Sequence, residues 1–71
     1  MKHSLDKYDL SRQQVLDLID AYIFNERNRQ ILRRRLLDGV GYEDLAEEFD
    51  LSVNHVKSVC YTAIQKLSSH I

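Results

Sequence analysis

Apolar residues recur at every third or fourth position along most of the chain, and nowhere do they alternate as a half-buried strand would require. In the last twenty residues these positions are Val56, Val59, Cys60, Ala63 and Leu67. At about 100° per residue they form one stripe along a helix, which buries that stripe against a partner. With no proline and two glycines in 71 residues, little interrupts such helices. The pattern predicts a single all-α domain.

Capping residues divide the chain into four expected helices. The starts are expected at Ser11, Asn25, Gly41 or Tyr42, and Ser52. Ser11 followed by Gln14 matches a capping box. The second helix is expected to run through Asp38, where Gly39 is the usual kind of C-terminal stop. The first and fourth helices are expected to end near Phe24 and Leu67. We therefore expect residues 11–71 to form the domain and residues 1–10 to be a lead-in that can be mobile.

The last two expected helices have the features of a helix-turn-helix motif. Such a motif needs a small residue where its helices cross, apolar residues that lock them, and a sharp turn. Ala46 is the small residue, and Val56 and Val59 face back from the second helix. At the turn, Asp50 stands where glycine is more usual, but aspartate tolerates a left-handed backbone better than most residues. The expected fold is a four-helix, bundle-like domain with a C-terminal helix-turn-helix.

Charge is unevenly distributed, although the net charge is only −1. Residues 26–35 carry five arginines, and residues 36–51 carry six carboxylates and no basic residue. From Ser52 to the end there are two lysines and no carboxylate, which indicates that this part meets an anion. Arg35 falls among apolar positions, so we expect a packed stem with its head at the edge or paired to an acid. For Arg27, Arg29, Arg33 and Arg34, helix solubility and pairing with the acidic third helix are the default, and phosphate clamping is the alternative.

The residue pattern does not favour catalysis. The three histidines are scattered, and Cys60 lies on the apolar face of its helix as a buried small hydrophobe, so neither a Cys/His pair nor a metal cluster is expected. We expect no enzyme activity, no metal ion and no cofactor. No long apolar run could serve as a signal peptide or a membrane span, and the single cysteine suits a reducing compartment. We therefore expect a cytoplasmic protein without membrane contact.

One long segment, ILRRRLLDGVGYEDLAEEFDLSVNHVKSVCYTAIQKL (residues 31–67), resembles region four of bacterial sigma factors, particularly the extracytoplasmic-function group. The matching positions include Arg35, Asp38, Gly39, Tyr42, Glu43, Asp44, Leu45, Ala46, Ser52, Val53, Val56, Lys57 and Ser58. The segment also resembles the four-helix effector domains of response regulators. Both resemblances imply that the fourth helix enters the major groove of DNA as a recognition helix.

The sequence departs from the sigma-factor pattern in two ways. Where that pattern has more basic residues late in the recognition helix, this chain has Val59, Thr62, Ile64 and Gln65. Fewer positive charges mean fewer phosphate contacts, so we expect binding that is weak or needs a partner. Nothing in the 71 residues resembles the sigma-factor regions that bind polymerase core and melt the promoter, so a complete sigma factor is not expected.

Candidate DNA contacts lie on the polar side of the fourth expected helix and at the start of the third. Asn54, Ser58 and Gln65 can donate to and accept from base edges, and Lys57 can reach a guanine edge or a phosphate. Backbone N–H groups near Tyr42 can meet a phosphate. The predicted DNA-binding residues are Tyr42, Ser52, Val53, Asn54, Lys57, Ser58 and Tyr61. We therefore expect a small bacterial or phage transcription regulator that binds double-stranded DNA.

Alternative interpretations remain open. The polar side of the fourth helix can be ordinary solvated surface, because the chain is slightly acidic overall. The domain can also be a protein-interaction module that engages RNA polymerase or a sigma factor through its first two helices, without strong DNA binding of its own. The apolar width of the first helix also allows a homodimer, whose two copies would meet half-sites about one DNA turn apart.

Overall fold

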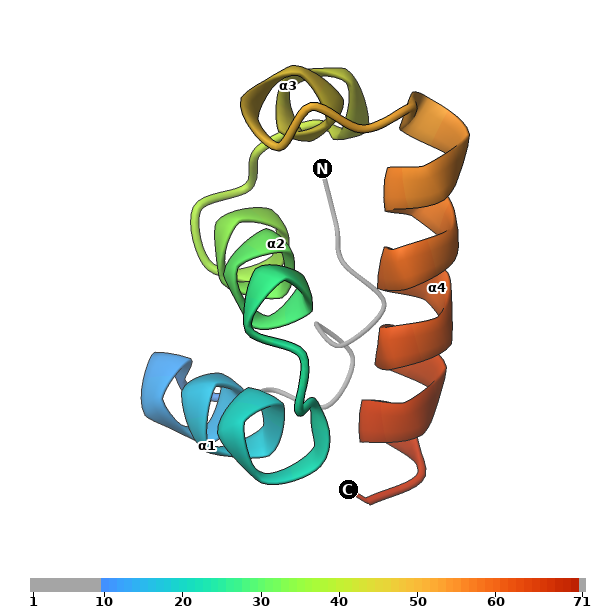
Figure 1. Cartoon of the computed structure of the whole chain (residues 1–71). Helices are drawn as coiled ribbons and strands as arrows, with labels where there is room; N and C mark the ends of the chain where they lie inside the picture. Colours follow the sequence, from blue (N-terminus) through green and yellow to red (C-terminus); the bar gives the residue numbers. More distant parts are fainter. Residues whose placement is uncertain (1–9, 71) are drawn as a thin grey trace.

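The computed structural model describes residues 10–70, which form four helices and no strand (Figure 1). The helices are α1 (Arg12–Tyr22), α2 (Glu26–Leu36), α3 (Tyr42–Glu48) and α4 (Val53–Ser68). The expected all-α class is confirmed. The expected lead-in falls outside the described residues except for Leu10, which is half-buried and packs against the core.

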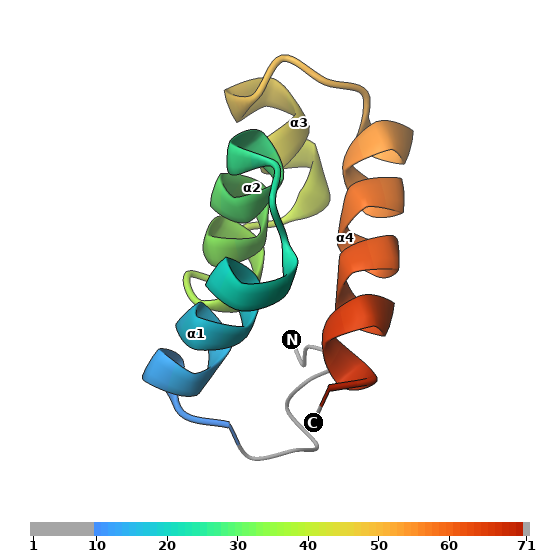
Figure 2. The same cartoon turned by 60° about the horizontal axis from the view of Figure 1, so that its bottom comes forward.

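The three shorter helices lie in a row beside the long α4 (Figures 1 and 2). α3 lies near the N-terminal end of α4, and α1 lies near its C-terminal end. The core fills the space between the row and α4, and every helix contributes to it. Its fully buried members are Ile19, Ile31, Leu32, Leu45, Val56, Cys60 and Leu67. Because the core lies on one side of α4, the other side is left to solvent.

Side-chain caps fix the starts of three helices, as the sequence predicts. The Ser11 hydroxyl accepts from the Gln14 N–H at 3.2 Å, and the Gln14 side chain accepts from the Ser11 N–H at 2.8 Å. The Asn25 side chain caps α2, and the Ser52 hydroxyl accepts from the His55 N–H at 3.1 Å to cap α4. Each cap satisfies a backbone donor that the helix itself leaves unpaired.

The second helix ends two residues earlier than expected, at Leu36 instead of Asp38. The Val40 N–H donates to the Arg34 carbonyl at 3.1 Å, which folds the chain back over the last turn of α2. Gly39 has a φ of 71°, a left-handed conformation that glycine adopts at little cost. Gly39 therefore ends the helix as predicted, but Asp38 belongs to the turn and not to α2.

The turn between α3 and α4 bends as the helix-turn-helix pattern requires. Asp50 has a φ of 55°, and the Leu51 N–H donates to the Ala46 carbonyl at 2.8 Å. The Asp50 N–H points to the Glu47 carbonyl at 3.4 Å, which completes a Schellman motif. Asp50 therefore takes the left-handed position that is more usual for glycine.

Surface ion pairs connect neighbouring helices of the row. The Arg34 guanidinium binds both carboxylate oxygens of Glu48 in α3, at 2.7 and 2.9 Å. Arg33 pairs with Asp20 of α1 at 3.0 Å. Among the described residues, Arg34 is the arginine of α2 that forms an ion pair with α3. The expected pairing with the acidic helix does not hold for Arg29 and Arg33, whose acidic partners are Glu26 and, for Arg33, also Asp20. Within residues 10–70, no helix combines the length and the apolar character that crossing a membrane would take.

Candidate nucleic-acid interface

The side of α4 that faces away from the core carries polar side chains. The buried residues of α4 are Val56, Cys60, Ala63, Ile64 and Leu67. Asn54 and Ser58 are exposed on the opposite side, and Thr62 and Gln65 continue this polar side toward the C-terminus. None of these exposed residues is covered by the core, so the first turns of α4 can approach another molecule.

The seven predicted DNA-binding residues lie at the start of α3, at the N-cap of α4 and in the first nine residues of α4. Asn54, Ser58, Ser52 and Tyr61 are exposed, and Tyr61 is 57% exposed. The other three, Tyr42, Val53 and Lys57, are half-buried. Ser52 uses its hydroxyl to cap α4, and Val53 packs partly against the core. These two residues therefore support the fold as well as the surface.

Tyr42, Lys57 and Tyr61 form a cluster that joins α3 to α4. The Tyr42 and Tyr61 rings meet edge to face, with centroids 6.0 Å apart and planes at 83°. The Lys57 ammonium lies 5.9 Å from the centre of the Tyr42 ring, within the range of a cation–π contact. Burial raises the pKa of Tyr42, so its hydroxyl stays protonated at neutral pH. Lys57 thus has an aromatic neighbour at the edge of the candidate surface.

Arg35 lies behind this cluster among apolar residues, as expected, but the expectation that its head reaches the edge is wrong. The whole side chain is buried, with 5% exposed, so its head does not reach the edge. Its Nη1 donates to the Val40 carbonyl at 3.1 Å, and its guanidinium carbon lies 4.2 Å from the centre of the Tyr42 ring. A contact between Arg35 and a predicted site residue was missed, because no local spacing indicates which ring a buried arginine will meet.

Two exposed carboxylates limit what the start of α3 can bind. Glu43 and Asp44 lie in the first turn of α3 and line a small hollow with Gly41, Tyr42 and Lys57. They offset the positive end of the helix, so they also oppose a phosphate there. The phosphate contact expected from backbone N–H groups near Tyr42 stays a prediction.

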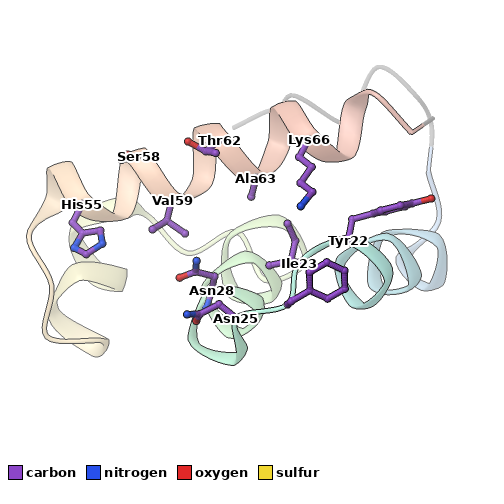
Figure 3. Close-up of a pocket in the computed structure, with 11 residues that line it drawn as sticks. Tyr22, Ile23, Asn25, Asn28, His55, Ser58, Val59, Thr62, Ala63 and Lys66 are labelled. Atoms are coloured by element: carbon purple, nitrogen blue, oxygen red, sulfur yellow. The ribbon is translucent and has the colours of Figure 1, made fainter.

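A second surface lies beside α4, and Ser58 is the predicted DNA-binding residue that borders it. A hollow of about 370 Å³ separates α4 from the turn between α1 and α2. Figure 3 shows Asn25 and Asn28 on one side of it and His55, Val59 and Lys66 on the other. Among residues 10–70, no carboxylate lines the hollow. Phe24, at its rim, is 76% exposed, and the Lys66 ammonium lies 5.5 Å from its ring centre.

The candidate metal ligands and the cysteine thiol are the side chains on which metal binding or nucleophilic chemistry would depend. Within residues 10–70, no group of three or more histidine, cysteine, aspartate or glutamate side chains is arranged to hold a metal. Cys60 is fully buried, and this burial raises the pKa of its thiol, which keeps the thiol neutral. Cys60 is therefore a buried apolar residue, as the sequence predicts.

Comparison with known families gives one match. The model described as "Sigma-70, region 4" matches residues 24–69, which include all of α2, α3 and α4 and leave α1 outside. This family has a helical helix-turn-helix fold and a DNA-binding, regulatory role in transcription, and it is not an enzymatic family. No curated protein and no solved structure matches the chain.

Proposed function

The chain belongs to the sigma-70 region 4 family, and from this premise we propose that it is a small DNA-binding transcription regulator of a bacterium or phage. In this proposal α4 enters the major groove and α3 lies across it as the supporting helix. The protein then acts in the cytoplasm, where the DNA of a bacterium lies.

The observation that carries the proposal is the exposed start of α4. Asn54 and Ser58 lie on the side away from the core, four residues apart and therefore about one helical turn apart. Both side chains can donate and accept hydrogen bonds, as base edges in the major groove require. Lys57 lies at the side of this face and can reach a phosphate or a guanine. A face of this kind suits a groove better than it suits plain solvation, because it contains no carboxylate.

The remaining predicted contacts flank the residues that are proposed to contact base edges. Tyr61 is exposed and can lie along the sugar-phosphate backbone, while the half-buried Val53 can place a methyl group against a thymine methyl. Contacts to phosphate would position α4 without reading sequence. In this arrangement sequence discrimination rests mainly on Asn54, Ser58 and Lys57.

The affinity for DNA is expected to be modest, because few basic side chains are available to contact phosphate. Arg29, Arg33 and Arg34 are engaged in ion pairs with carboxylates of the domain. Lys57 and Lys66 are the basic residues of α4. Since each phosphate contact adds to affinity by releasing counterions, few such contacts leave binding weak. We propose that RNA polymerase is a second partner, which would supply the affinity that DNA contacts alone do not.

A salt series tests the proposal. A fluorescein-labelled random-sequence duplex is titrated with the protein at several salt concentrations, and binding is followed by fluorescence anisotropy. The logarithm of the affinity is expected to fall linearly with the logarithm of the salt concentration, with a slope of about −0.9 for each phosphate neutralised. Absence of binding to random and promoter-like duplexes at low salt, or binding that salt does not weaken, would overturn the proposal.

A protein-interaction module is the second candidate function, and the exposed Phe24 favours it. An aromatic side chain that is 76% exposed beside an acid-free hollow is a typical anchor for a protein partner. Phe24→Ser should weaken binding to RNA polymerase core in a pull-down, while DNA affinity stays unchanged. If the protein bound polymerase through this surface and no DNA at all, this candidate would replace the first.

A further inference from the structure

We infer that Arg35 is a positioning residue for the DNA-binding face: its buried guanidinium holds the Tyr42 ring, and that ring holds Lys57 and Tyr61 in place. This inference rests on the proposed function, because the face it orders is the one proposed to meet DNA. Arg35 itself is buried and does not reach DNA. Its effect on binding therefore passes through Tyr42.

Arg35 is an unusual choice for a core position. It lies in α2 next to Leu36 and near Ile31 and Leu32, which are almost completely buried. Taking a charged group out of water costs free energy, and an apolar side chain of similar volume often packs at such a position equally well or better. Burial alone therefore does not explain an arginine at this position.

The contacts of Arg35 give a reason. One nitrogen donates to the carbonyl of Val40, in the turn that leads into α3, at 3.1 Å. The guanidinium carbon is 4.2 Å from the centre of the Tyr42 ring, the first residue of α3. A planar guanidinium can bond in its plane and stack on its face at the same time, which neither lysine nor an apolar side chain can do. Arg35 thus fixes the position of a ring at the start of α3.

The Tyr42 ring in turn contacts two residues of the recognition helix. Tyr61 of α4 meets it edge to face at 6.0 Å, and the Lys57 ammonium of α4 lies 5.9 Å from its centre. Both α4 residues belong to the predicted DNA-binding set. If the ring were free to turn, Lys57 would lose a neighbour that limits its conformations, and ordering the long side chain on DNA would cost more.

Three variants and one control test the inference. Arg35→Met keeps an unbranched side chain of similar length but removes the planar group, and Tyr42→Leu removes the ring. The third variant combines both changes. The control is Arg34→Met, one position away, whose guanidinium binds Glu48 instead of the cluster. Circular dichroism checks that each variant is folded, and anisotropy with the labelled duplex gives the affinity.

We expect Arg35→Met and Tyr42→Leu each to lower DNA affinity by about three- to tenfold, the size of a partly buried cation–π contact. We expect Arg34→Met to leave affinity unchanged. In the Tyr42→Leu background, Arg35→Met should cause no further loss, because residues that act through one another are not additive. An equal loss in both backgrounds would mean that Arg35 acts only through its charge, and it would overturn the inference.

A measurement without DNA separates this inference from the proposed function. In the folded wild type, nuclear Overhauser cross-peaks between the Tyr42 and Tyr61 rings are expected from their edge-to-face contact. These cross-peaks should weaken in Arg35→Met and persist in Arg34→Met. If they persist unchanged in Arg35→Met, the inference fails even if the wild type binds DNA. If the wild type binds no duplex, the proposed function fails, and the affinity effect inferred for Arg35 fails with it. The cross-peaks still show whether Arg35 orders the ring.

Arg35→Lys replaces Arg35→Met as the test variant if Arg35→Met does not fold. Lysine keeps the charge but lacks the planar group, so the inference predicts the same loss of affinity and the same weakened cross-peaks. Full affinity and unchanged cross-peaks in Arg35→Lys would overturn it.

Discussion

Lys57 and Lys66 lie on the same helix, and each ammonium lies near an aromatic ring, but Lys57 also shares a hollow with Glu43 and Asp44. Lys57 has its ammonium 5.9 Å from the Tyr42 ring centre, and Lys66 has its ammonium 5.5 Å from the ring centre of Phe24. Lys57 adjoins Asn54 and Ser58 in the first half of α4, whereas Lys66 lies near its C-terminal end beside the hollow. The two lysines therefore allow a comparison of the proposed DNA-binding face with another part of the same helix.

Lys57→Glu is expected to lower DNA affinity by at least about tenfold, because a contact to a base edge or phosphate worth roughly 1–3 kcal/mol becomes a repulsion. Lys66→Glu makes the same change of charge outside the proposed face and should cost clearly less. Fluorescence anisotropy gives both dissociation constants, and circular dichroism shows whether the fold persists. Equal losses in the two variants would mean that only total charge matters and that the assigned face is wrong.

Several side chains could be understood from the sequence, and others could not. Asp50 could, because the turn needs a left-handed residue and aspartate tolerates that conformation; its φ is 55°. Arg35 could be placed among apolar positions by helical phase, but its contact with Tyr42 depends on how α2 and α3 pack. The ion pair of Arg33 with Asp20, thirteen residues away, likewise follows from the tertiary structure alone.

Among the four helices, α3 is the one whose start lacks a side-chain cap. Its N-cap residue is Gly41, with a φ of −71°, and no side chain bonds the first free N–H groups. Gly39, two residues earlier, has a φ of 71°. A Cβ atom at either glycine would meet no atom within 4 Å. The two positions therefore differ in backbone conformation and not in available space.

Gly41→Ser should raise the free energy of unfolding by a few tenths of a kcal/mol, because serine can cap α3 where glycine cannot. Gly39→Ser should lower it by about 1 kcal/mol, because a Cβ atom strains the left-handed conformation. Urea denaturation measures both changes. The prediction is contradicted if Gly39→Ser stabilises the protein. It is also contradicted if Gly41→Ser lowers the free energy of unfolding by about 1 kcal/mol, the loss expected for Gly39→Ser.

The positions of the helices were largely predictable, and their ends less so. Three side-chain caps and the spacing of apolar residues indicated all four helices, because both signals are local in sequence. The end of α2 was placed two residues too late, since the hydrogen bond from Val40 to Arg34 closes the turn before Gly39. The hollow beside α4 was not predictable, because residues from the α1–α2 turn and from α4 meet there only in the folded chain.

The arrangement of the domain as a whole depends on how the row of three helices is held against α4. The core joins every helix, and the ion pair of Arg34 with Glu48 ties α2 to the helix that supports α4. This pair lies on the surface, so its contribution to stability is small and is screened by salt. Its effect is best seen as a dependence of stability on pH.

The hydrogen bond from Arg34 lowers the pKa of Glu48 below its ordinary value. A carboxylate whose pKa is lowered by folding stabilises the folded state above its unfolded pKa, and this contribution is lost as the pH falls through the folded pKa. Stability should therefore fall as the pH drops below about 4.5, the ordinary pKa of a glutamate, and it should fall less steeply in Glu48→Gln. Urea midpoints measured across this range test the prediction.

Glu47→Gln is the control for this pH series, because Glu47 is an exposed carboxylate of the same helix with no ion-pair partner among residues 10–70. Its pH dependence should follow the wild type. If Glu48→Gln and Glu47→Gln had the same pH dependence, the Arg34–Glu48 pair would not be formed in solution.

The most direct test of the account follows the backbone amides of the labelled protein by nuclear magnetic resonance while a DNA duplex is added. The account predicts that shifts cluster at residues 41–61, where α3 begins and α4 presents Asn54, Lys57 and Ser58. No response to random or promoter-like duplexes, together with shifts at residues 11–36 when RNA polymerase is added, would contradict it.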